Sequence, residues 1–290
     1  MGLFLGIDGG GSGCRAVVGD RAGRVLGRGE GGAANIWTNP EGALASILAG
    51  AGAAAAEAGA EPSRLAAVLG LAGANMAGAA AWLAGRLPFA AARIETDVVV
   101  ALKGALGPTD GVTATIGTGS VFGVQRGGGV RMLGGWGFVL GDQGSGARIG
   151  RDLLELTLLA HDGIREASPL TREMLGVFRN DPQDVVEFTT NAKPGDFGGF
   201  APKVFEHAAK GDPVAQAIVA KAVADVEAAL AALDLDGGDP LCLLGGLAPL
   251  YAPRLSARYQ AMLKPPLQDA LGGAVAMAAR MFGKAEPVHG

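Results

Sequence analysis

The amino-acid sequence predicts an α/β protein built from two domains. A chain of 290 residues is long enough for two domains of ordinary size. Short apolar runs of strand length alternate with longer segments of helical pattern along the chain. A strand, a glycine turn and a returning strand open the chain and recur about a hundred residues later, which indicates a repeated structural unit. The break in the pattern near Gly107 places the two domains at residues 1–107 and 108–290.

The start of the chain reads as a strand, a turn that is almost free of side chains, and a second strand. Leu3–Ile7 is an apolar run too short for a helix, Asp8 ends it, and Gly9–Gly13 follows. Glycines let the backbone approach a ligand and aim several N–H groups at phosphate oxygens, and a nearby carboxylate suits Mg²⁺. A plain glycine-rich hairpin is the competing interpretation. No Lys-Ser/Thr pair follows the glycines, so the segment is not a Walker A loop.

The elements of the first domain follow from apolar runs and from the residues that punctuate them. Pro40 opens a long helix at the position in the first turn that proline favours. The predicted strands are 3–7, 14–19, 24–28, 65–71 and 93–95, and the predicted helices are 40–58, 79–86 and 98–106. A glycine spacing typical of dinucleotide sites occurs at Gly27, Gly29 and Gly32, but no helical pattern follows it, so we interpret this match as chance.

The second domain repeats the opening pattern and then becomes mostly helical. The predicted strands are 112–116, 121–125, 130–133 and 241–244, and the predicted helices are 147–160, several within 164–230, 252–261 and 274–282. The turn Gly117–Ser120 offers backbone N–H groups and two hydroxyls to phosphate, and a glycine-rich loop spans 134–146. The last strand ends at Gly245-Gly246, where a flat ring could lie against bare backbone.

Composition excludes several classes of partner. The net charge is −4 and no basic tract occurs, so we expect no nucleic acid partner. Leu65–Gly85 carries no charge over 21 residues, but its alanines, its glycines and Asn75 make it a poor membrane span, so we expect no membrane partner. The apolar run at the N-terminus has no basic residues before it and does not resemble a signal peptide. Cys14 and Cys242 are far apart and make no metal spacing, which favours a reducing, cytoplasmic location.

Five motifs in order along the chain resemble those of the N-acetylglucosamine kinase and BadF/BadG ATPase family, of the actin-like sugar-kinase superfamily. They are Gly6–Ser12, Ile116–Ser120, Gly134–Gly137, Gly141–Ser145 and Leu244–Gly246, and the resemblance extends from residue 3 to about residue 280. It implies two domains of ribonuclease-H-like fold around a cleft that holds ATP, Mg²⁺ and an amino sugar. It also implies that the last helix packs back on the first domain, and it is compatible with a homodimer.

The resemblance also assigns roles to individual residues. Asp8 would bind Mg²⁺ through water, and Asp97 would be the catalytic base. The residues implied to bind nucleotide are Gly10, Gly11, Ser12, Gly117, Thr118, Gly119, Gly199, Gly245 and Gly246. The residues implied to bind the sugar are Asn35, Asp97, Gly135, Trp136, Gly137 and Asp142.

Three of these residues have competing structural interpretations. Asp97 ends a strand and precedes a helix, so it could cap that helix instead of accepting a proton from a sugar hydroxyl. Asp142 could cap the helix after Gly146, or its carboxylate could accept two hydroxyl groups of one sugar. Trp136 could anchor a core, although its glycine neighbours favour a place in the sugar pocket. Gln143 stands where many family members carry Glu.

Three functions are consistent with the motifs. The first is an ATP-dependent kinase that phosphorylates the 6-hydroxyl of N-acetylglucosamine or glucosamine. The second is an ATPase that activates a radical dehydratase or a coenzyme A-ester reductase, which needs thiolate ligands for an iron–sulfur cluster. Neither Cys14 nor Cys242 is placed for that role. The third is a noncatalytic sugar sensor, which the absence of a helix-turn-helix extension disfavours.

Overall fold

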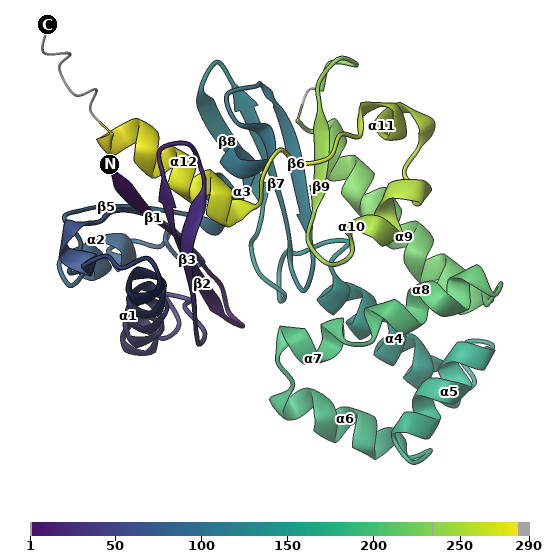
Figure 1. Ribbon diagram of the computed structural model, residues 1–290. Helices are drawn as coiled ribbons and strands as arrows, with labels where there is room; N and C mark the ends of the chain where they lie inside the picture. The colour runs from purple at the N-terminus through teal and green to yellow at the C-terminus, as the bar shows by residue number, and fades with distance from the viewer. Residues whose placement is uncertain (1, 234, 284–290) are drawn as a thin grey trace, which may run out of the picture. The chain divides into compact units, whose positions relative to one another are not determined.

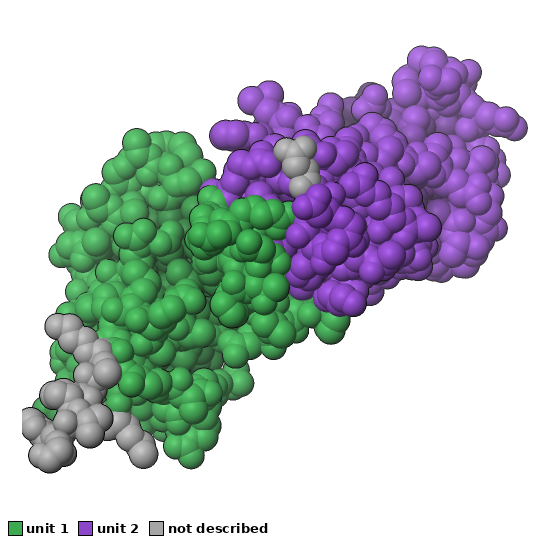
Figure 2. Space-filling view, turned by 90° about the horizontal axis from the view of Figure 1, so that it is seen from above, with its two compact units in different colours: residues 1–110, 125–130, 265–290 green, residues 111–124, 131–264 purple. Residues whose placement is uncertain are grey.

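A computed structural model describes residues 2–233 and 235–283. The chain divides into two compact units, coloured separately in Figure 2. Unit 1 comprises residues 1–110, 125–130 and 265–290, and unit 2 comprises residues 111–124 and 131–264.

The first sheet has five strands in the order β3-β2-β1-β4-β5 (Figure 1). They are β1 (Leu3–Gly9), β2 (Cys14–Asp20), β3 (Val25–Gly31), β4 (Ala66–Leu71) and β5 (Ala91–Glu95). The first three strands form an antiparallel meander, whereas β4 runs parallel to both β1 and β5. The carboxyl ends of β1, β4 and β5 therefore lie at one edge of the sheet. In open α/β sheets this edge is where ligands bind.

Helices cover both faces of this sheet. One face packs on α1 (Pro40–Glu57) and α2 (Ala79–Ala84), through side chains that include Ile47, Leu69 and Leu83. The other face packs on α3 (Asp97–Leu106) and α12 (Ala270–Phe282), through side chains that include Val68, Val100 and Val275. A one-turn 3₁₀ helix (Pro62–Arg64) leads into β4.

Two glycines of the dinucleotide-like spacing, Gly27 and Gly29, lie in β3, and the third, Gly32, follows the strand. A Cβ built on Gly27, Gly29 or Gly31 would lie 2.1–2.2 Å from a backbone oxygen of α1. Alternate residues of a strand face one side of the sheet, so these three glycines form a bare stripe on which the helix lies. The spacing of Gly27 and Gly29 therefore reflects packing against α1, which agrees with the interpretation of the match as chance.

Helices α3 and α12 also approach each other through glycine. A Cβ built on Gly104 of α3 would lie 2.1 Å from the carbonyl oxygen of Asp269, and one built on Gly273 of α12 would lie 2.3 Å from that of Val100. These contacts involve backbone atoms, which cannot rotate away. The two glycines therefore set the spacing of the helix pair.

We expect Gly104→Ala to lower the stability of the protein by about 1–3 kcal/mol, because overpacking forces the backbone to shift. Gly52→Ala is the matched control, since Gly52 lies in α1 and a Cβ there meets nothing within 4 Å. That change should stabilise the protein by about 0.5–1 kcal/mol through helix propensity. Thermal unfolding of both variants measures the difference, and equal midpoints would contradict the packing role.

The second sheet has four strands in the order β8-β7-β6-β9, which repeats the order β3-β2-β1-β4 of the first sheet without a counterpart of β5. Its strands are β6 (Gly111–Ile116), β7 (Ser120–Arg126), β8 (Gly129–Gly134) and β9 (Leu241–Leu244). Strand β9 runs parallel to β6, as β4 does to β1. The repeated unit expected from the sequence is thus confirmed.

Helices α4 to α9 follow β8 in the chain. They are α4 (Gly146–His161), α5 (Pro169–Val177), α6 (Pro182–Asn191), α7 (Pro194–Gly198), α8 (Ala201–Ala209) and α9 (Pro213–Ala231). After β9 come α10 (Ala248–Tyr251), a 3₁₀ turn (Ala252–Arg254) and α11 (Ala257–Met262). The single helix expected at 252–261 was wrong, because that segment holds the 3₁₀ turn and α11. The α/β fold class is confirmed. Within residues 2–233 and 235–283, no helix has the length and apolar character that crossing a membrane requires.

Candidate functional site

Unit 1 gathers its predicted site residues at the carboxyl edge of the first sheet. Asp8 is the next-to-last residue of β1, and Asp97 follows the end of β5 by two residues. Strand β4, between them, pairs Gly70 with both Asp8 and Glu95. The two carboxylates are near enough that the charge of Asp8 helps to raise the pKa of Asp97. The sheet therefore places both acids on one side of the unit.

The glycine turn after β1 keeps backbone donors available. The Gly10 N–H donates to the Gly13 carbonyl at 2.9 Å, and the Gly10 carbonyl accepts from Ala34 N–H at 2.8 Å. The Gly11 and Ser12 N–H groups make no hydrogen bond within the described part of the chain. A Cβ on Gly10 or Gly11 would meet nothing within 4 Å, so the space around the turn is open. The turn can therefore bind an anion through its backbone.

Asp8 is paired with an arginine that the sequence analysis did not single out. The Arg15 Nη2 donates to Asp8 Oδ2 at 2.6 Å, and these residues face each other across the β1–β2 hairpin. The Asp8 side chain keeps 21% of its surface exposed. Aligning the two predicted strands across the glycine turn would have revealed the pair, because facing residues in a hairpin are fixed by register.

Asp97 is not the cap of its helix. The N-cap of α3 is Thr96, whose Oγ1 accepts from Val99 N–H at 3.3 Å. Asp97 Oδ1 accepts from the adjacent Val98 N–H at 2.9 Å. Burial raises the pKa of Asp97 above its ordinary value, the Val98 hydrogen bond opposes this, and the negative charge of Asp8 adds to it. A carboxylate with a raised pKa near an anion-binding turn is a candidate proton acceptor.

Asn35 lies beside the same turn, on the loop after β3. Its Oδ1 accepts from the backbone N–H groups of Trp37 and Thr38, at 3.0 and 3.1 Å. The backbone N–H of its neighbour Ala34 donates to the Gly10 carbonyl, which holds this loop beside the turn. With the oxygen used, the Asn35 amide is fixed in orientation and its NH₂ group can donate to a ligand.

Unit 2 has a corresponding edge at the ends of β6 and β9. The Leu247 N–H donates to the Ile116 carbonyl at 3.1 Å, which joins the two strand ends. Gly245 has φ of +88°, and a Cβ there would lie 2.4 Å from the same carbonyl oxygen. A Cβ on Gly117 would lie 4.0 Å from Gly246 N. Gly117 and the Gly245-Gly246 pair therefore lie next to each other.

The third predicted nucleotide segment of unit 2 also comes to this edge. A Cβ on Gly198, the neighbour of Gly199, would lie 3.8 Å from the Thr118 Cα. The first N–H groups of α4 are already used, because Gly146 and Ala147 donate to the Gly117 and Thr118 carbonyls. The N–H groups of Thr118 and Gly119 make no hydrogen bond among the described residues. They are the donors that remain for an anion.

The loop of residues 134–141, called the Trp136 loop below, holds the remaining predicted residues. Trp136 is 77% exposed, so it does not anchor a core. Asp142, directly after the loop, is only 9% exposed. It does not cap α4 either, since Ser145 Oγ accepts from Arg148 N–H at 3.3 Å. Burial raises the pKa of Asp142, while hydrogen bonds from the Ser120 and Gly137 backbone and the charge of Arg148 oppose the shift.

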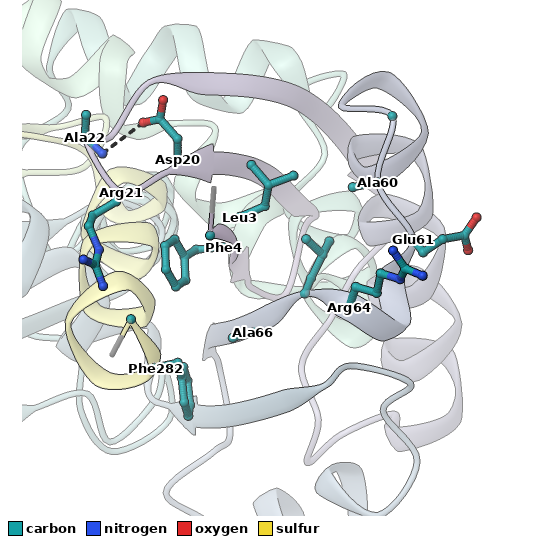
Figure 3. A pocket seen from close by; sticks show the side chains of 14 residues that line it. Leu3, Phe4, Asp20, Arg21, Ala22, Ala60, Glu61, Arg64, Ala66 and Phe282 are labelled. Atoms are coloured by element: carbon teal, nitrogen blue, oxygen red, sulfur yellow. Dashed lines mark hydrogen bonds between the residues drawn. The ribbon is translucent and has the colours of Figure 1, made fainter. Parts of the chain in front are cut away.

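Unit 1 also has a large hollow, of about 970 Å³, at the amino end of its sheet (Figure 3). Phe4 and Phe282 line it together with Glu61 and Arg64. Phe4 lies near the start of β1 and Ala66 starts β4, so this hollow is at the edge opposite Asp8. It contains none of the site residues expected from the sequence.

Comparison with known proteins agrees with the motifs. Residues 5–266 match the BadF/BadG/BcrA/BcrD ATPase family. The chain is 36% identical over 284 residues to the glucosamine kinase GspK of Vibrio cholerae, with 97% of each chain covered. It is 35% identical over 148 residues to N-acetyl-D-glucosamine kinase of Dictyostelium discoideum, which covers 49% of this chain and 44% of that one.

A solved structure extends the similarity to three dimensions. A candidate N-acetylglucosamine kinase from Chromobacterium violaceum is 33% identical, with a TM-score of 0.88 over 96% of this chain and 99% of that chain. The resemblance drawn from the five motifs is therefore confirmed, and the chain belongs to the BadF/BadG/BcrA/BcrD ATPase family.

Proposed function

We propose that the protein is an ATP-dependent kinase that phosphorylates the 6-hydroxyl of an amino sugar, glucosamine or N-acetylglucosamine. The observation that carries this proposal is Asp97. Thr96 caps α3, so the Asp97 carboxylate is not needed as the cap. That carboxylate has a raised pKa and lies at the same sheet edge as the glycine turn. The similarity to a glucosamine kinase over nearly the whole chain supports the same class of substrate.

In this proposal, the glycine segments bind ATP. Gly10, Gly11 and Ser12 bind the β- and γ-phosphates, and the donors are the N–H groups of Gly11 and Ser12, which have no partner among the described residues. Gly117, Thr118 and Gly119 supply further phosphate contacts, and Gly199, Gly245 and Gly246 flank the adenosine. Backbone donors of this kind stabilise negative charge without reorganising.

Asp8 is the residue that fits Mg²⁺. Its carboxylate oxygens are hard ligands, its side chain is partly exposed, and the anion-binding turn follows it directly. We propose that it holds the ion through a bound water. When bound, Mg²⁺ neutralises charge on the phosphate oxygens. Arg15, which is paired with Asp8 here, brings a second positive charge to the same place.

The sugar-binding residues follow from the loops beside the acids. We propose that Asn35 donates its amide to a sugar hydroxyl, and that Gly135, Trp136 and Gly137 line the sugar pocket. Asp97 accepts the proton of the 6-hydroxyl as the oxygen attacks the γ-phosphate in line. A positioned base of this kind contributes about 10²–10⁴-fold. Because its substrate is ATP, such a kinase would act in the cytoplasm.

A coupled assay of ADP release tests the proposed function directly. With Mg·ATP we expect turnover with glucosamine or N-acetylglucosamine, and much less with N-acetylmuramic acid or glucose. The product should carry its phosphate at the 6-position in a phosphorus NMR spectrum. The control is 6-deoxyglucosamine, which lacks the attacking hydroxyl and should release no ADP. Absence of turnover with all four sugars would contradict the proposal.

The alternative function, activation of a radical enzyme, is disfavoured by the cysteines. An iron–sulfur cluster needs accessible thiolate ligands, but Cys14 and Cys242 are each 1% exposed. Burial and the charge of Asp8 raise the pKa of Cys14 to about 11, which disfavours its thiolate. The protein incubated with ferrous iron and sulfide under reducing conditions should stay colourless and free of iron. A stable iron-containing product would favour the alternative.

A further inference from the structure

The turn that joins β7 to β8 groups with a different unit from the strands that carry it. Residues 125–130, called the β7–β8 tip below, belong to unit 1, whereas the rest of both strands belongs to unit 2. Gln125, the first residue of the tip, is only 1% exposed although its side chain is polar. A buried amide is costly unless its hydrogen bonds are made. Its partners therefore show what holds the tip.

The partners of the Gln125 side chain all lie at the C-terminal end of α3. Its Nε2 donates to the carbonyls of Gly107 and Thr109, at 3.2 and 2.7 Å. Its Oε1 accepts from Lys103 Nζ at 2.5 Å. A primary amide has two N–H donors and one carbonyl oxygen, so both donors and the oxygen of Gln125 are in use. This side chain serves the contact with α3 and leaves no donor for a ligand.

The backbone of the β7–β8 tip is bonded at the same place. The Asp110 carboxylate accepts from Gly127 N–H, with 3.0 Å to each of its oxygens. Asp110 is the last residue of unit 1 before the chain enters unit 2, and Gly127 lies in the middle of the tip. The Gln125 side chain and the Gly127 backbone therefore tie the tip to the segment that follows α3.

A third segment is bonded to the same helix end. The last four carbonyls of a helix have no partner inside it. In α3, the Gly104 carbonyl accepts from Gln268 N–H at 3.0 Å. The Ala105 carbonyl accepts from Leu267 N–H at 2.9 Å. Residues 265–268 are the first of unit 1 after the chain returns from unit 2. Three segments that adjoin a passage of the chain between the units are thus fastened at the C-terminal end of α3.

Helix α3 and strands β7 and β8 lead from this place to the proposed site residues. Asp97, the proposed base, is the first residue of α3. Strand β7 begins with Ser120, directly after the Gly117–Gly119 turn, and β8 ends with Gly134, where the Trp136 loop starts. Groups carried by helices and strands are held more precisely than groups on loops. The attachment of one end of such an element therefore influences the groups at its other end.

We propose that Gln125 is a positioning residue for phosphoryl transfer, because it fastens the strands that carry the Gly117–Gly119 turn and the Trp136 loop to the helix that carries the proposed base. This inference rests on the proposed function for the roles of the base, the turn and the loop. Gln125 acts through the elements that it joins. A misplacement of about 1 Å can slow a reaction by about 10²-fold, so a loose attachment should slow phosphoryl transfer more than it weakens nucleotide binding.

Hydrogen exchange of the unliganded protein tests the attachment. Gln125→Met keeps an unbranched side chain of similar length and removes the amide, so the buried carbonyls of Gly107 and Thr109 each lose a donor. We expect the backbone amides of 107–110 and 125–128 to exchange about tenfold faster than in the wild-type protein. Exchange in β1 should stay unchanged.

Gln260→Met is the matched control. Gln260 lies in α11, and its Nε2 also donates to two carbonyls, those of Pro253 and Leu255, at 3.3 and 2.6 Å. The substitution removes the same kind of contact from a place outside the β7–β8 tip. We expect it to leave exchange over 107–110 and 125–128 at the wild-type rate.

Asp110→Ala tests the same attachment through an exposed residue, so it also serves if Gln125→Met does not fold. It removes the acceptor of Gly127 N–H, and exchange over 125–128 should again be about tenfold faster. Wild-type exchange over 125–128 in Asp110→Ala, or in a folded Gln125→Met, would overturn the attachment.

Steady-state kinetics tests the positioning role at a temperature well below the unfolding midpoints. We expect Gln125→Met to lower kcat for amino-sugar phosphorylation by about tenfold or more. The Kd of a nonhydrolysable ATP analogue should stay within about twofold of the wild-type value. Gln260→Met should keep the wild-type kcat. An unchanged kcat in Gln125→Met, an equal loss in Gln260→Met, or an equally large loss of analogue affinity would overturn the positioning role.

The two measurements distinguish this inference from the proposed function. If the wild-type protein phosphorylates no amino sugar, the proposed function is contradicted, and the exchange comparison still decides whether Gln125 holds the β7–β8 tip. If the wild-type protein is active while Gln125→Met and Asp110→Ala exchange at the wild-type rate, the proposed function stands and this inference is overturned.

Discussion

Asp97→Asn is expected to reduce kcat for sugar phosphorylation by about 10²–10⁴-fold, the contribution of a positioned general base. The amide keeps an oxygen that can accept from Val98 N–H, so the start of α3 should remain intact. Binding of the ATP analogue, measured by calorimetry, should stay within about twofold of wild type, because Asp97 is not among the proposed nucleotide contacts. The substitution is therefore expected to slow the phosphoryl-transfer step and to leave nucleotide binding unchanged.

Glu95→Gln is the matched control for this variant. Glu95 ends β5 two residues earlier and pairs with Arg93 at 2.7 Å, so its loss removes a nearby negative charge without removing the proposed base. We expect near wild-type kcat from it. Full activity in Asp97→Asn, or an equal loss in Glu95→Gln, would rule out Asp97 as the base.

The pH profile provides a second measurement of the same residue. The base works only when it is deprotonated, so kcat/KM should fall as the pH drops through the pKa of Asp97. Burial and the charge of Asp8 raise that pKa, so the acidic limb should lie above the ordinary aspartate value of about 3.9. The residual activity of Asp97→Asn should lack this limb. If the acidic limb persists in Asp97→Asn, the limb reports the titration of another group.

Part of this fold could be predicted because its signals are local in sequence. An apolar run precedes Asp8 and a glycine turn follows it, and the same pattern recurs around Gly117. Periodicity and glycine content alone predict a strand–turn–strand unit at both places. Strand register then follows from the turn. This is why the strands and the two glycine turns were found at the expected places, whereas the single helix expected at 252–261 was not.

Other features depend on contacts between distant segments. Nothing near Gly104 or Gly273 shows that each faces the backbone of another helix segment. The bond between the Ser120 hydroxyl and the Gln143 carbonyl spans 23 residues of sequence. The choice of Thr96 instead of Asp97 as the cap of α3 depends on the backbone angles at the end of β5. Such choices are made by tertiary packing, which sequence pattern does not contain.

Asp8→Asn is expected to reduce kcat/KM by about 10²–10³-fold, the range for losing one preorganised electrostatic contact. The amide is a weaker ligand for Mg²⁺ than a carboxylate and cannot neutralise Arg15, which donates to Asp8 at 2.6 Å. Binding of the ATP analogue should therefore respond less to Mg²⁺ than in the wild-type protein. Calorimetric titrations with Mg²⁺ and with EDTA measure that difference.

Asp20→Asn provides the control, because it repeats the chemistry of Asp8 at the other end of the β1–β2 hairpin. Asp20 also pairs with an arginine, Arg24 at 3.2 Å, but it faces Leu3 in the strand register, far along β1 from the glycine turn. Loss of that ion pair should affect stability slightly and leave the Mg²⁺ response unchanged. If Asp8→Asn and Asp20→Asn both retain the wild-type dependence on Mg²⁺, Asp8 does not hold the ion. If only Asp8→Asn loses it, the Mg²⁺ that accompanies ATP binds at the carboxyl edge of the first sheet.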